Sequence, residues 1–191
     1  MTNGLEMGDA YTATLGRIME QDGDKGKLGI EVLMWISRSE RPLHVEELCR
    51  ALAIEKESTE LDLQNVPAIG TLLSCCLGLV TMDQEESSVR LIHLTLQEYL
   101  SGHHHIFNSA HSKMAEVCLT YLNFQSIKDL PPTLLAPPPQ TPFLSYASCH
   151  FDGFDWARGY CEATLLTQGS ESQLTRYPWP YTTVDGSFEW A

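Results

Sequence analysis

The stretch Val89-Arg90-Leu91-Ile92-His93-Leu94-Thr95-Leu96-Gln97-Glu98-Tyr99-Leu100 decides the fold of this chain. Its first half alternates residue by residue, as in a β-strand, where successive side chains point to opposite faces. One face then carries Val89, Leu91 and His93, and the other carries Arg90, Ile92 and Leu94. The second half has helical spacing and follows without a loop. The stretch therefore predicts a short strand that turns directly into a helix.

The start of this helix has the pattern of a well-formed cap. Thr95 and Glu98 have the spacing of a capping box, in which each side chain bonds a backbone N–H at the helix start. Leu94 and Tyr99 stand at the two positions of a hydrophobic staple, which would fix the angle between strand and helix. His93 is then held at a stiff corner. Such a corner can serve a packed core or a ligand.

Composition and charge restrict the class of protein and of partner. The chain has 191 residues, of which 43% are hydrophobic. This length and composition suffice for one domain, or one and a half, with a hydrophobic core. The net charge of −13 opposes attraction to nucleic acid phosphates and to anionic membranes. We therefore expect protein partners, with no nucleic acid and no membrane.

The sequence favours an intracellular, cytoplasmic location. No apolar run reaches the roughly 18 residues that a membrane helix needs, and the first residues lack the pattern of a signal peptide. The cysteines form no C-x-x-C pair and mostly have apolar neighbours, so we expect them to be reduced and buried. They are Cys49, Cys75, Cys76, Cys118, Cys149 and Cys161.

The order of the expected elements predicts a mainly α fold. Apolar stripes at helical spacing begin near residues 11, 28, 43 and 69, and two short β runs follow over 79–83 and 89–94. Four helices and then a hairpin, with the third helix close behind the second, are the plan of a winged-helix domain with a small β-hairpin wing. We expect a flexible N-terminal end (1–10), a winged-helix domain (11–107), a helical extension (108–150) with a Pro-rich linker (131–142), and an irregular tail (151–191).

Several helix ends are also predicted. Arg41-Pro42 ends the second helix, because the residue before a proline avoids the α region. His44 occupies the N-cap of the third helix, with Glu47 three residues on, although Ser, Thr or Asp would be better there by ~1 kcal/mol. Further helices are expected over 96–107 and 110–124, and another beginning at Phe143.

The motifs point to no catalytic residue and no metal site. The G-x-x-x-x-G-K-[ST] and G-x-S-x-G motifs are absent from the sequence. Neighbouring side chains on a helix point about 100° apart, so His103-His104-His105 cannot converge on one metal ion. Cys118 could pair with His93 or His150 as a nucleophile, but it is centred on an apolar stripe where a thiolate is unfavourable. We therefore predict that the chain is not an enzyme.

A winged helix also suggests DNA binding, with its third helix in the major groove. We assign that role to the helix that begins at residue 43. This helix and its exit carry Glu46, Glu47, Glu55 and Glu57 against Arg50 and Lys56. Phosphates would be repelled by such a surface, so DNA binding is the weaker alternative.

Several separated motifs resemble one known family. The motifs are Trp35-Ile36, Arg41-Pro42-Leu43, Glu46-Glu47-Leu48, Cys76-Leu77-Gly78-Leu79-Val80 and the stretch quoted above. They resemble the winged-helix segment that follows the NACHT NTPase module in fungal STAND (NOD-like) proteins, also catalogued as the GPI inositol-deacylase winged helix. Ala115-Glu116-Val117-Cys118-Leu119-Thr120-Tyr121-Leu122 and Pro142-Phe143-Leu144-Ser145-Tyr146-Ala147 resemble the helical region that follows. The resemblance covers about residues 11–150, and the catalogued name implies no deacylase chemistry.

The resemblance implies a role for the strand-to-helix corner. In such proteins the NACHT module binds ADP or ATP, the winged helix clamps the inactive state, and ankyrin or similar repeats sense the signal. His93 matches the histidine of the His-x-[ST]-[LF]-x-Glu-[YF] motif, which in relatives approaches the β-phosphate of bound ADP across the domain interface. His93 would therefore be a nucleotide-sensing residue, with Thr95, Glu98 and Tyr99 as the structural corner.

These 191 residues contain no NACHT module, so ADP or ATP would be bound only through a partner NACHT domain, in cis or in trans. The sequence thus predicts a non-catalytic regulatory module of signal transduction, without a cofactor or metal of its own, that acts by protein–protein docking. The alternatives are a DNA-binding winged-helix protein and a stand-alone, truncated protein-interaction module. We expect the isolated chain to show no ATP hydrolysis and no DNA affinity at moderate salt.

Overall fold

The computed structural model describes residues 3–131 and 136–150. The expected tail at 151–191 and residues 132–135 of the expected Pro-rich linker lie outside the described residues.

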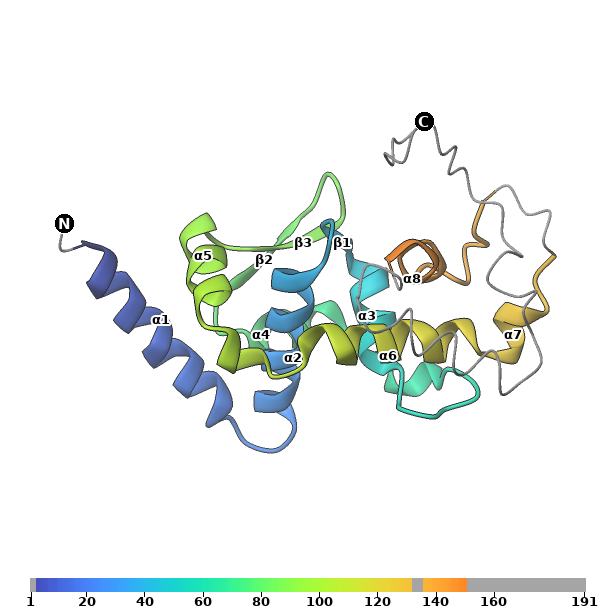
Figure 1. The fold of residues 1–191 in the computed structure, drawn as a ribbon, viewed down its shortest axis with the longest axis horizontal. Coiled ribbons are helices and arrows are strands. Elements are labelled where there is room, and N and C mark those ends of the chain that lie inside the picture. The colour runs from blue at the N-terminus through green and yellow to red at the C-terminus, as the bar shows by residue number, and fades with distance from the viewer. Residues whose placement is uncertain (1–2, 132–135, 151–191) are drawn as a thin grey trace.

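Helices dominate the structure, and a small sheet packs against them (Figure 1). The helices are α1 (Asn3–Met19), α2 (Lys25–Arg38), α3 (Val45–Ala53), α4 (Ile69–Cys75), α5 (Leu94–Gly102), α6 (Ala110–Leu122), α7 (Gln125–Lys128) and α8 (Leu144–His150), with short 3-10 helices η1 (Leu63–Asn65) and η2 (His104–Phe107). The strands are β1 (Leu43–His44), β2 (Val80–Asp83) and β3 (Ser88–Leu91).

The three strands form one antiparallel sheet in the order β1-β3-β2. β2 and β3 are the predicted hairpin, with Val80 opposite Leu91. β1 pairs with the other edge of β3, with Leu43 opposite Val89. The sequence analysis did not predict β1, because a strand of two residues is too short for alternation to reveal it.

Helices α2, α3 and α4 form a winged-helix unit with this sheet. β1 lies between α2 and α3 in the chain, α4 directly precedes the hairpin, and β3 is the central strand. The predicted fold class, mainly α with a small hairpin wing followed by further helices, is confirmed. Helix α1 precedes the winged-helix unit and is not counted in it. The third helix of the unit is therefore α4, and the assignment of that role to the helix beginning near residue 43 is wrong.

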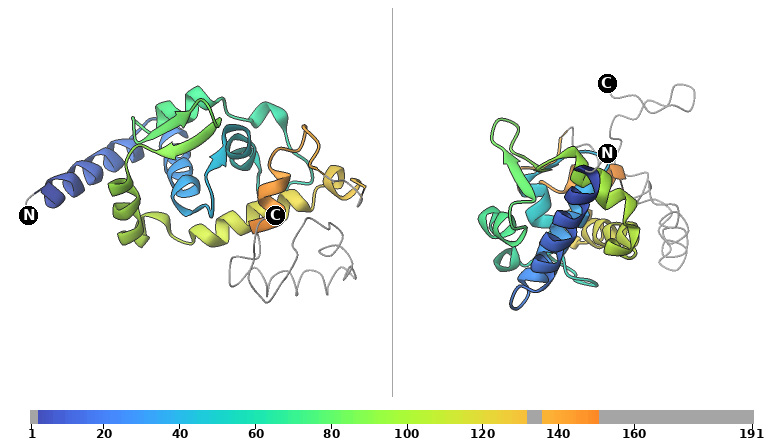
Figure 2. Two further views of the ribbon diagram at one scale, coloured as in Figure 1. Left: turned by 90° about the horizontal axis from the view of Figure 1, so that it is seen from above. Right: turned by 90° about the vertical axis from the view of Figure 1, so that its left-hand side faces the viewer.

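Helix α2 is the centre of the core. It contacts α1, α3, α4, α5, α6 and β3, and the view from above in Figure 2 shows it between the sheet and α6. Val32, Leu33 and Trp35 are at most 2% exposed, as expected of a helix surrounded by protein on most sides. The rings of Phe143 and Tyr146 lie 5.8 and 6.0 Å from the ring of Trp35. The winged-helix unit and the helical extension therefore share one core.

Helix boundaries differ from the sequence prediction in several places. α1 begins at Asn3, whereas the sequence predicted a flexible end over 1–10 and a helix start near Tyr11. Residues 3–10 carry no apolar stripe, and a helix nucleated by its packed half extends through them. The single helix expected over 96–107 is α5 followed by η2, with the change of direction at His103. Beyond α6, the short helix α7 was not predicted.

The cysteines in the described part of the chain are free. Cys49, Cys75, Cys76 and Cys118 are buried as predicted, and Cys149 is half-buried. Cys161 lies outside the described residues. Within those residues, no helix is long and apolar enough to cross a membrane.

Candidate functional site at the corner between β3 and α5

The predicted corner is present, and it faces solvent. β3 ends at Leu91, and the backbone N–H of Ile92 still donates to the carbonyl of Leu79 at 3.0 Å, so the sheet continues to the edge of the corner. His93 follows in an extended conformation, with φ −144° and ψ 146°, and is the N-cap of α5. The backbone N–H of Leu96 donates to the His93 carbonyl at 3.1 Å, which closes the first helical turn.

The predicted capping box and staple are wrong. α5 begins at Leu94, so His93 and not Thr95 is the N-cap, and the His93 side chain makes no cap hydrogen bond. The hydroxyl of Thr95 instead bonds the hydroxyl of Tyr11 on α1, at 2.8 Å. Leu94 is 74% exposed and cannot staple the helix. Glu98 is exposed as well.

Helix α1 packs against α5 and holds it in place through side-chain contacts. The hydroxyl of Tyr99 bonds that of Thr12 at 2.7 Å, and the Tyr99 and Tyr11 rings lie 5.5 Å apart. His103 stacks on the other side of Tyr99 at 4.1 Å, and its Nδ1 lies 2.7 Å from the Tyr99 carbonyl oxygen. Two hydrogen bonds, at Thr95 and at Tyr99, therefore join α5 to α1. They hold the orientation of α5 in place of the predicted local cap.

Three consecutive residues at this corner, Ile92 to Leu94, are exposed to solvent. Ile92 is 44% exposed and Leu94 is 74% exposed, and exposed His93 lies between them in the chain. The exposure of His93 excludes the interpretation of a core histidine. The sequence analysis found His93 but missed its neighbours, because alternation alone does not tell which strand face is covered. Two exposed large apolar residues this close in the chain are compatible with a surface that another protein covers.

Two other candidate groups, Cys118 and His103, are buried or engaged with neighbouring residues. Cys118 is fully buried, and burial raises the pKa of its thiol, so it does not supply a thiolate near neutral pH. His103 is engaged with Tyr99, and its ring lies 5.7 Å from that of His105 in an edge-on arrangement. In the described part of the chain, no cluster of three or more His, Cys, Asp or Glu side chains is placed to hold a metal ion.

The helix that would enter the major groove of DNA carries no positive charge. In a helix-turn-helix unit the second helix enters the major groove, and here that helix is α4. Its exposed residues are Gly70, Thr71 and Ser74. From residue 57 to residue 89, which includes α4 and the hairpin turn, the sequence has no lysine or arginine. The same segment has the acidic residues Glu57, Glu60, Asp62, Asp83, Glu85 and Glu86. The corrected assignment of the third helix therefore leaves the electrostatic argument against phosphate binding in place.

The three helices α2 to α4, the β1-β3-β2 sheet and the hairpin between β2 and β3 define a winged-helix domain. Its exposed apolar corner lies at the junction of the wing with the helix that follows it. The family model described as GPI inositol-deacylase, winged helix domain, matches residues 17–115, and the chain belongs to this family. The match runs from α1 into α6 and includes the corner. No curated protein and no solved structure matches the chain.

Proposed function

We propose that this chain is a non-catalytic regulatory module that docks on the nucleotide-binding domain of a NACHT-type STAND protein, in cis or in trans. The observation that carries the proposal is the exposed run of Ile92, His93 and Leu94 on a corner braced by α1. In this proposal the chain has no cofactor or metal of its own, and ADP or ATP belongs to the partner domain.

The chemistry of the corner suits an interface next to a phosphate. Burying Ile92 and Leu94 against a partner would remove apolar surface from water, which favours association. The imidazole of His93 stands at the N-terminus of α5, where the helix carries a partial positive charge. An imidazole N–H in this position can donate to a phosphate oxygen of a nucleotide that the partner holds.

Nucleotide exchange would then change the strength of docking. A histidine that contacts ADP but not ATP stabilises the docked state only while ADP is bound. Loss of that contact would shift the population toward the released state. The size of this shift is set by the difference in docking free energy between the ADP-bound and the ATP-bound partner. Ankyrin-type or similar repeats would be the source of the signal in such a protein.

The docking surface can be tested with matched variants. We expect the paired substitutions Ile92→Ser and Leu94→Ser to weaken binding to an ADP-loaded NACHT-type domain by about tenfold or more, since interface apolar anchors dominate affinity. Leu63→Ser is the control, because Leu63 is 66% exposed on η1, outside the corner. Affinity is measured by titration with the purified domain. Equal weakening by the control variant, or no weakening by the pair, would contradict the proposal.

The alternatives make different predictions. We expect no ATP turnover and no DNA affinity at moderate salt from the isolated chain. A gel shift that weakens steeply with salt would support the DNA-binding alternative, against which the charge of residues 57–89 argues. Docking on a partner without any dependence on nucleotide would support the stand-alone interaction module.

A further inference from the structure

The short helix α8 lies in a groove of the winged-helix unit and α6. It contacts α6, and Figure 1 shows it end-on beside that helix. Phe143, Leu144, Tyr146 and Ala147 are 0% exposed. These anchors stand at positions i, i+1, i+3 and i+4, which is one face of a helix. Leu144, Tyr146 and Ala147 of α8 are therefore buried together with Phe143, which immediately precedes this helix of seven residues.

Aromatic rings form the floor of the groove. The Trp35 ring of α2 lies 5.8 Å from the Phe143 ring and 6.0 Å from the Tyr146 ring, both in edge-on arrangements. The Tyr121 ring of α6 lies 5.3 Å from the Phe143 ring. Edge-to-face pairs at these distances add stabilisation beyond the area that they bury. Phe143, just before α8, and Tyr146 within it are thus the two aromatic anchors of this segment.

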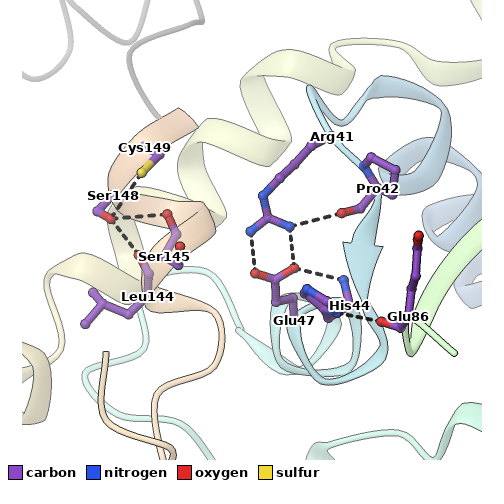
Figure 3. A network of polar contacts seen from close by, with 9 residues as sticks. All are labelled: Arg41, Pro42, His44, Glu47, Glu86, Leu144, Ser145, Ser148 and Cys149. Carbon is purple, nitrogen blue, oxygen red and sulfur yellow. Dashed lines mark hydrogen bonds and ion pairs between the residues drawn. The ribbon is translucent and has the colours of Figure 1, made fainter. Parts of the chain in front are cut away.

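An arginine closes the groove over Tyr146. The Arg41 guanidinium carbon lies 5.3 Å from the centroid of the Tyr146 ring, a cation–π distance. Figure 3 shows Arg41 between α8 and the start of α3, held by two bonds to the Glu47 carboxylate and one to the Pro42 carbonyl. The guanidinium is therefore fixed by groups of the winged-helix unit and is already oriented toward the helix that it covers.

The segment that contains α8 satisfies much of its own backbone. Leu144 N–H donates to the Thr141 carbonyl at 3.0 Å, and Ala147 N–H donates to the Phe143 carbonyl at 2.9 Å. The Ser148 hydroxyl donates to the Leu144 carbonyl at 2.8 Å. A helix of this length is not stable alone in water, so the groove must supply its stability. A short helix with local hydrogen bonds and apolar anchors in a groove is a recurring mode of peptide recognition.

We propose that the groove between α2, the start of α3 and α6 is a helix-binding site, and that residues 142–150 of this chain are its separable, built-in ligand. Trp35 and Arg41 lie within the residues that the family model matches, 17–115, whereas Tyr121 of the floor and residues 142–150 lie outside that match. The site takes an amphipathic helix with aromatic anchors at i and i+3. This inference concerns a different face from the corner and does not depend on the proposed function.

The test cleaves the full chain between the winged-helix unit with α6 and the segment that contains α8. A protease-recognition sequence is inserted after Ala136, on the N-terminal side of the Pro138 carbonyl that accepts from Thr141. After cleavage we expect the two pieces to co-elute in size-exclusion chromatography. An excess of a synthetic peptide of residues 137–150 then displaces the C-terminal piece.

Peptide variants make the test specific. A Tyr146→Ala peptide should need about a tenfold higher concentration or more for displacement, because it lacks the anchor under Arg41. A Ser145→Ala peptide is the control, since Ser145 is only half-buried and is not an anchor. Separation of the pieces on cleavage, failure of the wild-type peptide to displace at any concentration, or equal displacement by the Tyr146→Ala peptide would each overturn the proposal.

Discussion

Glu47 is an acidic residue that is only 3% exposed, and its carboxylate organises the start of α3. It accepts the backbone N–H of His44 at 2.9 Å and both terminal nitrogens of Arg41. Hydrogen bonding to Glu47 raises the pKa of Arg41, so the guanidinium stays charged. The buried carboxylate is fully compensated as long as both partners are present.

Replacing this carboxylate should destabilise the fold strongly. We expect Glu47→Gln to lower the free energy of unfolding by about 2–4 kcal/mol, because it leaves the partly buried Arg41 without its counter-ion. Glu46→Gln is the matched control, since Glu46 is the exposed neighbour on the same turn and should have little effect. Urea unfolding of the two variants measures both values. Similar losses in the two variants would show that Glu47 has no special role.

At the residue scale, the sequence predicted local relations and missed distant ones. His44 as N-cap with Glu47 three residues on was predicted, because both groups belong to one helical turn. Thr95 was predicted with the wrong partner, since its hydroxyl bonds Tyr11, a residue 84 positions away. A local motif cannot show that a cap residue has a better partner on another helix. His93 was located at the corner, but its solvent exposure depends on what covers β3 and could not be predicted.

The contact of α2 with its neighbours depends on a glycine. A Cβ added at Gly29 would lie 2.7 Å from the Cys75 carbonyl oxygen of α4 and 2.8 Å from a methyl carbon of Ile18 on α1. The Cys75 carbonyl belongs to the backbone of α4, so it cannot rotate away from an added Cβ as a flexible side chain could. Gly29 therefore lets α2, α4 and α1 approach closely.

A methyl group at this position should force the helices apart. We expect Gly29→Ala to lower stability by about 1–3 kcal/mol through overpacking. Gly70→Ala is the control, because a Cβ there meets nothing within 4 Å and alanine favours a helix over glycine by up to about 1 kcal/mol. Thermal unfolding compares the two. A neutral or stabilising Gly29→Ala would contradict the packing described here.

At the scale of elements, periodicity identified the helices that bury a continuous stripe. α2, α4, α6 and the hairpin were predicted for this reason. β1 and α7 were missed because they are two and four residues long, too short for a period to show. The first turns of α1 were missed because their sequence has no apolar stripe, and propagation of the helix from the following residues extends it to Asn3.

At the scale of the whole molecule, the described residues share one core that extends from the winged-helix unit into the helical extension. Trp35, Tyr121, Phe143 and Tyr146 make ring contacts across the two parts. Burial raises the pKa of Tyr121 and of Tyr146 to about 12, from the ordinary value near 10. Both hydroxyls are therefore neutral in the fold at a pH where they would ionise in the unfolded chain.

This burial makes the fold sensitive to alkaline pH. Since the folded pKa lies above the unfolded one, the stability due to each tyrosine is fully present below pH 10 and is lost as the pH rises from about 10 to about 12. The loss should be on the order of 2 kcal/mol for each group. Urea midpoints measured from pH 8 upward should fall in this window, and less so in Tyr146→Phe. An unchanged pH dependence in Tyr146→Phe would contradict the assignment.

One titration tests most directly the proposal that the His93 corner senses the nucleotide state of a partner domain. The affinity of the chain for a NACHT-type domain is measured with ADP and with a non-hydrolysable ATP analogue, for the wild type, His93→Ala and the control His104→Ala at another exposed histidine. The account predicts binding about tenfold tighter with ADP, a preference that His93→Ala abolishes and His104→Ala retains. Equal affinity with both nucleotides, or a preference that survives in His93→Ala, would contradict it.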